Sequence, residues 1–113
     1  MAKVEIVKSL YEEIEKKFKQ KADEIFDLMQ ELEENPHKGK LLGSVGGIVI
    51  KEIKYSNFRF YFITDGFKLK CMDQEALQDL LLRFVMMSNK KQQQDTIDKI
   101  KEILQKIGPS GFK

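Results

Sequence analysis

The chain has 113 residues, of which 42% are hydrophobic, and this length predicts one domain spanning residues 1–113 with a single core. The 20 basic and 18 acidic residues leave a net charge of +2, which excludes a polyelectrolyte. The single cysteine, Cys71, excludes an internal disulfide and a cysteine-based zinc cluster, and it favours a reducing compartment.

The N-terminal third and the remainder of the chain differ in charge. Residues 1–37 hold 6 Lys against 10 Asp or Glu (−4), whereas residues 38–113 hold 14 Lys or Arg against 8 Asp or Glu (+6). The basic part either attracts phosphates or is ordinary solvated charge, and charge alone does not decide between these interpretations. Because no apolar run reaches the length of a signal peptide or membrane span, we expect a cytoplasmic protein without a membrane segment.

The first elements are a short strand and a helical region. Val4 and Ile6 alternate with Glu5, which predicts a strand. From Leu10 to Leu32 apolar residues recur at intervals of three and four, which predicts a helix, or two stacked helices if the polar residues 19–23 form a break. Ser9 and Glu12 have capping-box spacing at its start, and Asn35-Pro36 ends it.

The remaining pattern predicts a meander and a last helix. We expect a glycine-rich loop at residues 37–47 and strands at residues 48–56, 58–66, 67–73 and 80–88, with turns at Ser56-Asn57 and Asp65-Gly66. Residues 74–79 form either a helical turn or a loop. The C-terminal helix carries Ile97, Ile100, Leu104 and Ile107 and ends at Gly108-Pro109. This order predicts an α+β fold with the helices on one side of an antiparallel sheet.

Cations occupy strand positions that face away from the core. In residues 58–63 the phenylalanines take one face, so Arg59 and Tyr61 take the other, and Lys54 shares that face if Ile53 points inward. Arg83 joins them if Leu82 and Phe84 are buried. Guanidinium groups fixed on a sheet suit phosphate oxygens, whereas the alternative is a half-solvated sheet in which Glu52 pairs with Arg59.

The other candidate residues give weaker indications of a metal, phosphate or base-binding site. His37 is the only histidine and lacks neighbouring metal ligands, and Gly43, Gly46 and Gly47 do not form a phosphate loop, so the sequence predicts no metal and no cofactor. Met86 and Met87 fill the core or an interface. Tyr61 either stacks on a base or packs in the core with its hydroxyl near water.

The segments "ELEENPHKGKLLG", "IVIKEIKYSNFRFYFITDG" and "LLLRFVMMSNKKQQQDTIDKIKEIL" together resemble the RelE/ParE toxin superfamily, particularly its phage-derived, HigB-like branch. The likeness covers roughly residues 10–107 and rests mainly on the order and spacing of short motifs. It implies a RelE-like fold, in which a helical hairpin packs on a four-stranded antiparallel sheet. It also implies a toxin that is neutralised by a cognate antitoxin.

Many members of this superfamily cleave mRNA in the ribosomal A site, and the ParE branch poisons DNA gyrase. The resemblance therefore implies a ribosome-dependent mRNA endonuclease in which the ribose 2′-hydroxyl attacks the adjacent phosphate. In this role Lys54 assists the 2′-hydroxyl, Arg59 holds the phosphate, and Arg83 stabilises the transition state or leaving group. The residues expected to contact RNA are Lys51, Lys90, Lys91 and Tyr61.

The chain departs from the family pattern at several positions. Arg83 stands where HigB-like relatives often have a histidine, and Met86 and Met87 stand where they often have lysines. No His or Tyr follows residue 61, so the usual C-terminal acid or base is absent. The alternative functions are a non-catalytic protein-binding member of the fold, directed at gyrase or degenerate, and a general RNA-binding module.

Overall fold

The computed structural model describes residues 2–70 and 74–113 of the chain. The elements up to the first long hairpin are β1 (Lys3–Ile6), α1 (Lys8–Phe18), η1 (Lys19–Lys21), α2 (Ala22–Gln30), η2 (Glu31–Glu33), β2 (Lys40–Val45) and β3 (Ile48–Tyr55). They are followed by β4 (Phe58–Asp65), α3 (Gly66–Lys70), α4 (Gln74–Gln78), β5 (Leu81–Asn89), α5 (Gln93–Lys106) and η3 (Pro109–Gly111). The predicted α+β class is confirmed.

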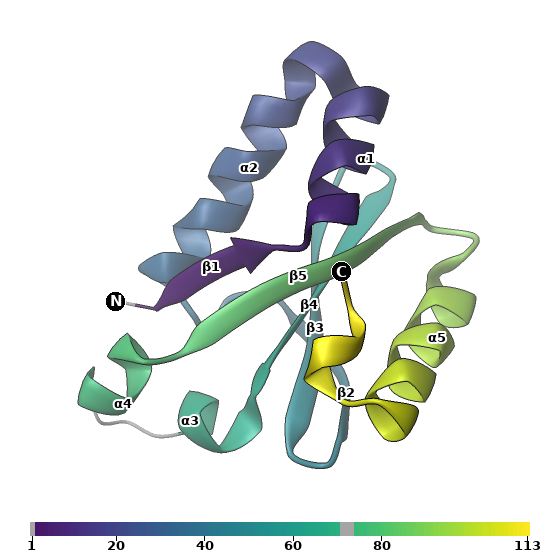
Figure 1. Cartoon of the computed structure of the whole chain (residues 1–113). Coiled ribbons are helices and arrows are strands. Elements are labelled where there is room, and N and C mark those ends of the chain that lie inside the picture. Colours follow the sequence, from purple (N-terminus) through teal and green to yellow (C-terminus); the bar gives the residue numbers. More distant parts are fainter. Residues whose placement is uncertain (1, 71–73) are drawn as a thin grey trace.

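The five strands form one sheet in the order β1-β5-β4-β3-β2 (Figure 1). All neighbours are antiparallel except β1 and β5, which run parallel. The β3–β4 hairpin turns at Ser56 and Asn57, as predicted, and its strands pair from Tyr55 opposite Phe58 to Ile48 opposite Asp65. This long, regular hairpin fixes which side chains share a face of the sheet.

The N-terminal helical region is two helices that form a hairpin, and the break lies at Lys19–Lys21, within the polar stretch. The predicted capping box is wrong. Helix α1 begins at Lys8 after Val7, which makes no side-chain cap, so Ser9 already lies inside the first turn. The Ser9 hydroxyl instead donates to the backbone carbonyl of Lys113 and ties the C-terminal end to α1.

The α1–α2 hairpin covers the phenylalanine face of the sheet. The Phe18 ring meets the Phe58 ring edge-on, with centroids 5.0 Å apart, and also packs against Phe60. Phe60 and Phe62 are fully buried, so the predicted core face of β4 is confirmed. The buried helix residues on this side include Leu10, Ile14, Ile25 and Met29.

Helix α5 lies on the opposite face, so the prediction that all helices share one side is wrong. Its Gln93 side chain donates to Glu52, which faces away from the phenylalanines. Ile97, Ile100 and Leu104 are buried as predicted, whereas Ile107 is 66% exposed because the helix ends at Lys106. Charged side chains on this second face are therefore partly covered instead of fully solvated.

The predicted loop at residues 37–47 and the predicted strand at residues 67–73 are wrong, and the structure decides the open choice at residues 74–79. Residues 40–45 of the expected glycine-rich loop form β2, which pairs with β3. The expected strand at 67–73 begins as the short helix α3, because the Asp65 carboxylate accepts the amides of Phe67 and Lys68. The rest of that strand, with Cys71, lies outside the described residues. Residues 74–78 form α4, the helical alternative.

None of the helices in the described residues is long and apolar enough to cross a membrane.

Gly66 lies where α3 leaves the sheet and is packed against the β2–β3 turn. Its amide donates to the Gly47 carbonyl, and an added Cβ would lie 2.8 Å from Val49 Cγ1 and 2.9 Å from Gly47 O. We expect Gly66→Ala to lower the free energy of unfolding by about 1–3 kcal/mol through overpacking. Urea unfolding measures this change.

Gly43→Ala is the matched control for Gly66→Ala. Its added Cβ would meet only the end of the flexible Lys101 side chain, which can move away. A Gly66→Ala variant as stable as Gly43→Ala would contradict the packing seen here.

Candidate functional site

Most of the predicted site residues on β3, β4 and β5 share one face of the sheet, namely Lys54, Arg59, Tyr61 and Arg83, whereas Lys51 lies on the other face. Lys54 lies opposite Arg59, and Arg59 lies opposite Ser88 on β5. Two residues further along the hairpin, Glu52 lies opposite Tyr61. At strand spacings of about 4.8 Å, Lys54 and Ser88 are roughly 10 Å apart across the sheet.

Arg59 is held by a buried carboxylate. Its Nε lies 3.3 Å from Glu52 Oε2, and the exposed fractions of the two side chains are 9% and 0%. The contact is an ion pair without hydrogen-bond geometry, whereas the second Glu52 oxygen accepts from Gln93 of α5. The pairing of Glu52 with Arg59, which was the alternative to a phosphate site, is therefore present. Together with Gln93 it joins β3, β4 and α5.

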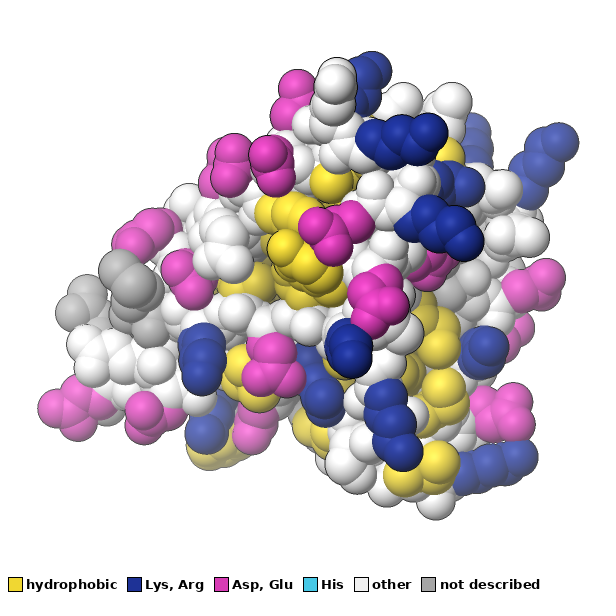
Figure 2. All heavy atoms as spheres, turned by 45° about the horizontal axis from the view of Figure 1, so that its top comes forward, with side chains coloured by type: hydrophobic (Ala, Val, Ile, Leu, Met, Phe, Trp, Pro, Cys, Tyr) yellow, Lys and Arg dark blue, Asp and Glu magenta, His cyan; other side chains and the backbone are white. Residues whose placement is uncertain are grey.

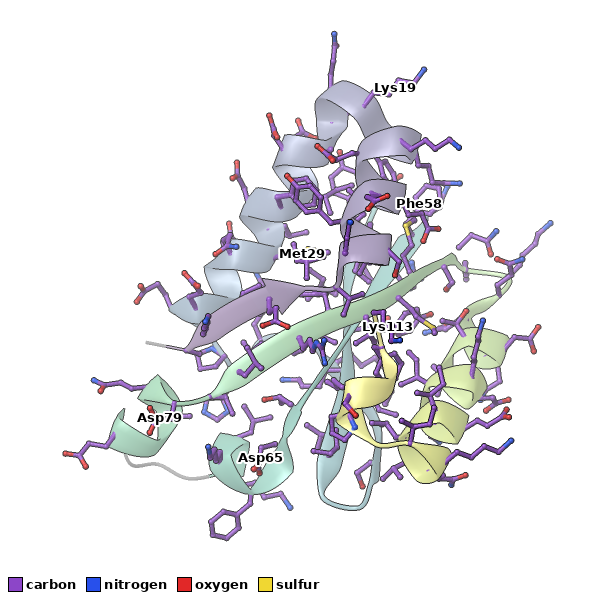
Figure 3. All side chains as sticks on the ribbon, viewed as in Figure 1. Lys19, Met29, Phe58, Asp65, Asp79 and Lys113 are labelled. Atoms are coloured by element: carbon purple, nitrogen blue, oxygen red, sulfur yellow. The ribbon has the colours of Figure 1, made fainter. Side chains whose placement is uncertain are left out.

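Arg83 is not brought together with Lys54 and Arg59. It lies opposite Ile63, four residues along β4 from Arg59, which is roughly 13 Å. Figure 3 shows the two ends of this strand, marked by Phe58 and Asp65, far apart. The Arg83 guanidinium is engaged by the Glu5 carboxylate at 3.1 Å and by the carbonyls of Pro109 and Phe112. Arg83 therefore anchors the C-terminal end to the sheet.

Lys51 and Tyr61 offer little surface to an RNA. Lys51 lies on the phenylalanine face, is 4% exposed and donates to the His37 carbonyl at 2.9 Å, and burial lowers its pKa. The Tyr61 ring is fully buried and its hydroxyl lies 2.7 Å from the Ser88 hydroxyl. Burial raises the pKa of Tyr61, so this phenol stays neutral near pH 7.

Lys54 is exposed and borders a hollow of about 390 Å³. Three lysines line this cavity, namely Lys38, Lys40 and Lys54, and we call the cavity the lysine hollow. Lys38 also forms an exposed ion pair with Glu31. Exposed ion pairs contribute little to folding stability. Among the described residues, Lys54 has no ion-pair partner, so its ammonium group is available to a ligand.

Gly39 brings the loop lysines close to Lys54. Its φ of +100° favours glycine, and an added Cβ would lie 3.0 Å from the Glu52 carbonyl oxygen and 3.2 Å from the Phe62 ring. The backbone of the loop is therefore pressed against β3, with Lys38 and Lys40 on either side of Gly39. Sequence reasoning missed these two lysines, although the spacing "KGK" was the available signal.

More cations surround the turn end of β3 and β4. Lys90 and Lys91 are exposed and follow Asn89, which pairs with Phe58. Lys17, which the sequence prediction also missed, places its Nζ 5.2 Å from the Phe58 ring centroid. In Figure 2 several acidic side chains lie at the upper left, over α2, and a group of basic ones lies at the upper right, while both kinds are mixed over the rest of this face.

This arrangement favours binding of an anion with several charges along its length. The lysine hollow offers three ammonium groups, and Lys17, Lys90 and Lys91 continue the basic surface around the β3–β4 turn. Within residues 2–70 and 74–113, no group of three His, Cys, Asp or Glu side chains is placed to hold a metal. Comparisons of the chain with protein-family models, curated proteins and solved structures give no match.

Proposed function

We propose that the chain is a toxin of the RelE/ParE type, neutralised by a cognate antitoxin, which binds RNA and cleaves mRNA on the ribosome. The observation that supports it best is the lysine hollow, where Lys38, Lys40 and Lys54 line one cavity beside the turn end of the sheet. Lysines bind RNA mainly through its phosphates, whose charge repeats at every nucleotide. A basic surface that continues to Lys90 and Lys91 suits such a ligand.

In the cleavage step the 2′-oxygen attacks the adjacent phosphorus and the bond to the 5′-oxygen of the next nucleotide breaks, which leaves a 2′,3′-cyclic phosphate. Water takes the proton of the 2′-hydroxyl and gives one to the departing 5′-oxygen. The step needs stabilisation of charge on the pentacoordinate phosphate. In the proposed site Lys54 supplies that charge directly, because its ammonium group is exposed at the hollow. Arg59, opposite Lys54, adds positive potential from a fixed position while Glu52 holds its guanidinium. Arg83 has no place in this step, since its donors are engaged by Glu5 and by carbonyls near the C-terminal end.

A second candidate, a non-catalytic member of the same fold, is favoured by one specific observation. The two arginines that the resemblance assigns to chemistry are both in ion pairs within the protein, with Glu52 and with Glu5. Their charge is therefore largely compensated before any ligand arrives. Such a protein would still bind RNA or a protein partner, but it would leave phosphodiester bonds intact.

Induced expression tests the proposed function. We expect growth arrest together with new 5′ ends inside translated mRNAs, mapped by primer extension, and we expect Lys54→Ala to reduce cleavage at least about tenfold. Lys106→Ala is the control, because Lys106 is an exposed lysine that pairs only with Glu102 on α5. Arrest without new mRNA ends would support the non-catalytic candidate, and the absence of both arrest and RNA binding would overturn the nuclease proposal.

A further inference from the structure

Strand β5 has one edge that β1 covers only in part. The pairing of β1 runs from Lys3 opposite Leu81 to Ile6 opposite Phe84, and the Val7 amide then donates to the Phe84 carbonyl. The chain turns into α1 at Lys8, while β5 continues to Asn89. Figure 1 shows β1 beside only the first part of β5. Residues 85–89 therefore have no strand partner on this edge among the described residues.

The main-chain groups at this edge can be assigned from the ladder. Tyr55 and Phe58 flank a two-residue turn and so form a hydrogen-bonded pair, after which the direction of the main-chain groups alternates along β4. Arg59 and Tyr61 consequently direct their N–H and C=O groups toward Ser88 and Met86. The N–H and C=O groups of Met87 and Asn89 then point away from β4, toward the open edge.

The open edge forms the floor of a groove of about 400 Å³. Met86 and Met87 line the floor, Leu10 and Glu13 of α1 line one wall, and Asp95 and Lys99 of α5 line the other. Both methionines are half-buried. The groove is thus apolar at its floor and flanked by helices on both faces of the sheet.

We propose that this groove binds an extended, basic segment of a partner protein, which adds to the sheet as a strand beside residues 85–89 of β5. The Asn89 carbonyl already accepts from the Ser88 hydroxyl, which leaves the amides of Met87 and Asn89 and the Met87 carbonyl for a partner. An edge with such main-chain groups recognises an extended backbone. Glu13 and Asp95, on opposite walls, have no ion-pair partner among the described residues. They outnumber Lys99, the one cation that lines the groove, so they favour lysine or arginine on the added strand. Apolar residues of that strand cover Met86 and Met87.

This groove is separate from the lysine hollow, although Lys90 and Lys91 of the basic surface directly follow Asn89 at its end. The lysine hollow lies beside β2 and β3, whereas the groove lies on the β1 side of β5, at the other edge of the sheet. The inference therefore stands or falls without the nuclease proposal. A protein that lacked RNA binding would still bind a strand here.

The experiment uses an acetylated, amidated heptapeptide of alternating Val and Lys as the probe, with amide hydrogen exchange of the full chain followed by NMR. We expect the peptide to slow exchange of the Met87 and Asn89 amides about tenfold or more. The amides of Met86 and Ser88 provide an internal control, because they already face β4 and should change little. Unchanged exchange at Met87 and Asn89 with saturating peptide would overturn the proposal.

Two matched controls separate strand addition from simple charge attraction. The same peptide N-methylated at alternate residues keeps its charge but loses main-chain donors, and we expect it not to protect Met87. The Glu13→Lys, Asp95→Lys double variant changes only exposed side chains, and we expect at least about tenfold weaker binding of the unmodified peptide. Equal protection by the methylated peptide, or unchanged affinity of the double variant, would each count against the proposed mode.

Discussion

Replacing Glu52 by glutamine is expected to lower the free energy of unfolding by about 3 kcal/mol, a large share of the roughly 5–15 kcal/mol typical of a domain. The carboxylate is fully buried and faces the Arg59 guanidinium, itself only 9% exposed. Removing the negative charge leaves the positive charge buried without compensation. Chemical denaturation followed by circular dichroism measures the loss.

Two variants make the Glu52 prediction specific. The matched control is Glu102→Gln, which removes an exposed carboxylate 2.8 Å from Lys106, and here we expect a change below about 1 kcal/mol. The double replacement Glu52→Gln, Arg59→Met removes both charges and should recover much of the stability. If Glu52→Gln were as mild as Glu102→Gln, the buried ion pair would not be an important part of the folded state.

The same variants bear on function. The positive charge of Arg59 is already compensated by the buried Glu52 carboxylate. It therefore attracts a phosphate less strongly than an unpaired guanidinium would. If the Glu52→Gln, Arg59→Met protein folds and still arrests growth, the pair holds the scaffold and the toxic surface lies elsewhere, as the lysine hollow suggests. If it folds and no longer arrests growth, Arg59 contributes to the activity itself.

The parts of the fold that follow a regular period were predictable from the sequence. The phenylalanines of β4 alternate strictly, and this alternation placed Arg59 and Tyr61 on the opposite face. Strand β2 was missed because Gly43 and the Gly46-Gly47 turn resemble a loop when read locally. Helix α3 was missed because the cap from Asp65 outweighed the alternation in "FKLK".

The site was harder to predict because its contacts are not local. Arg83 lies on the predicted face, but Glu5 and the carbonyls near Phe112 that engage it are distant in sequence. Tyr61 faces away from the phenylalanines, yet α5 covers that face and leaves its ring no exposed surface. In the same way, Lys38 and Lys40 join Lys54 only because Gly39 packs against β3.

The last prediction concerns the lysine hollow directly. We expect the triple variant Lys38→Ala, Lys40→Ala, Lys54→Ala to bind a short fluorescein-labelled oligouridylate about 10²- to 10³-fold more weakly at about 50 mM salt. Each phosphate contact with a single strand contributes a salt slope of about −0.7, so losing three contacts flattens the slope by about 2. Fluorescence anisotropy across a salt series measures both quantities.

The control for the triple variant keeps the same change in net charge. Lys99, Lys101 and Lys106 lie on α5 outside the hollow, and their replacement by alanine removes three cations as well. If net charge alone drove binding, the two triple variants would weaken it equally and flatten the salt slope to the same extent. A selective loss at Lys38, Lys40 and Lys54 requires that their ammonium groups act together on neighbouring phosphates, which is the property that separates an RNA site from a generally basic surface.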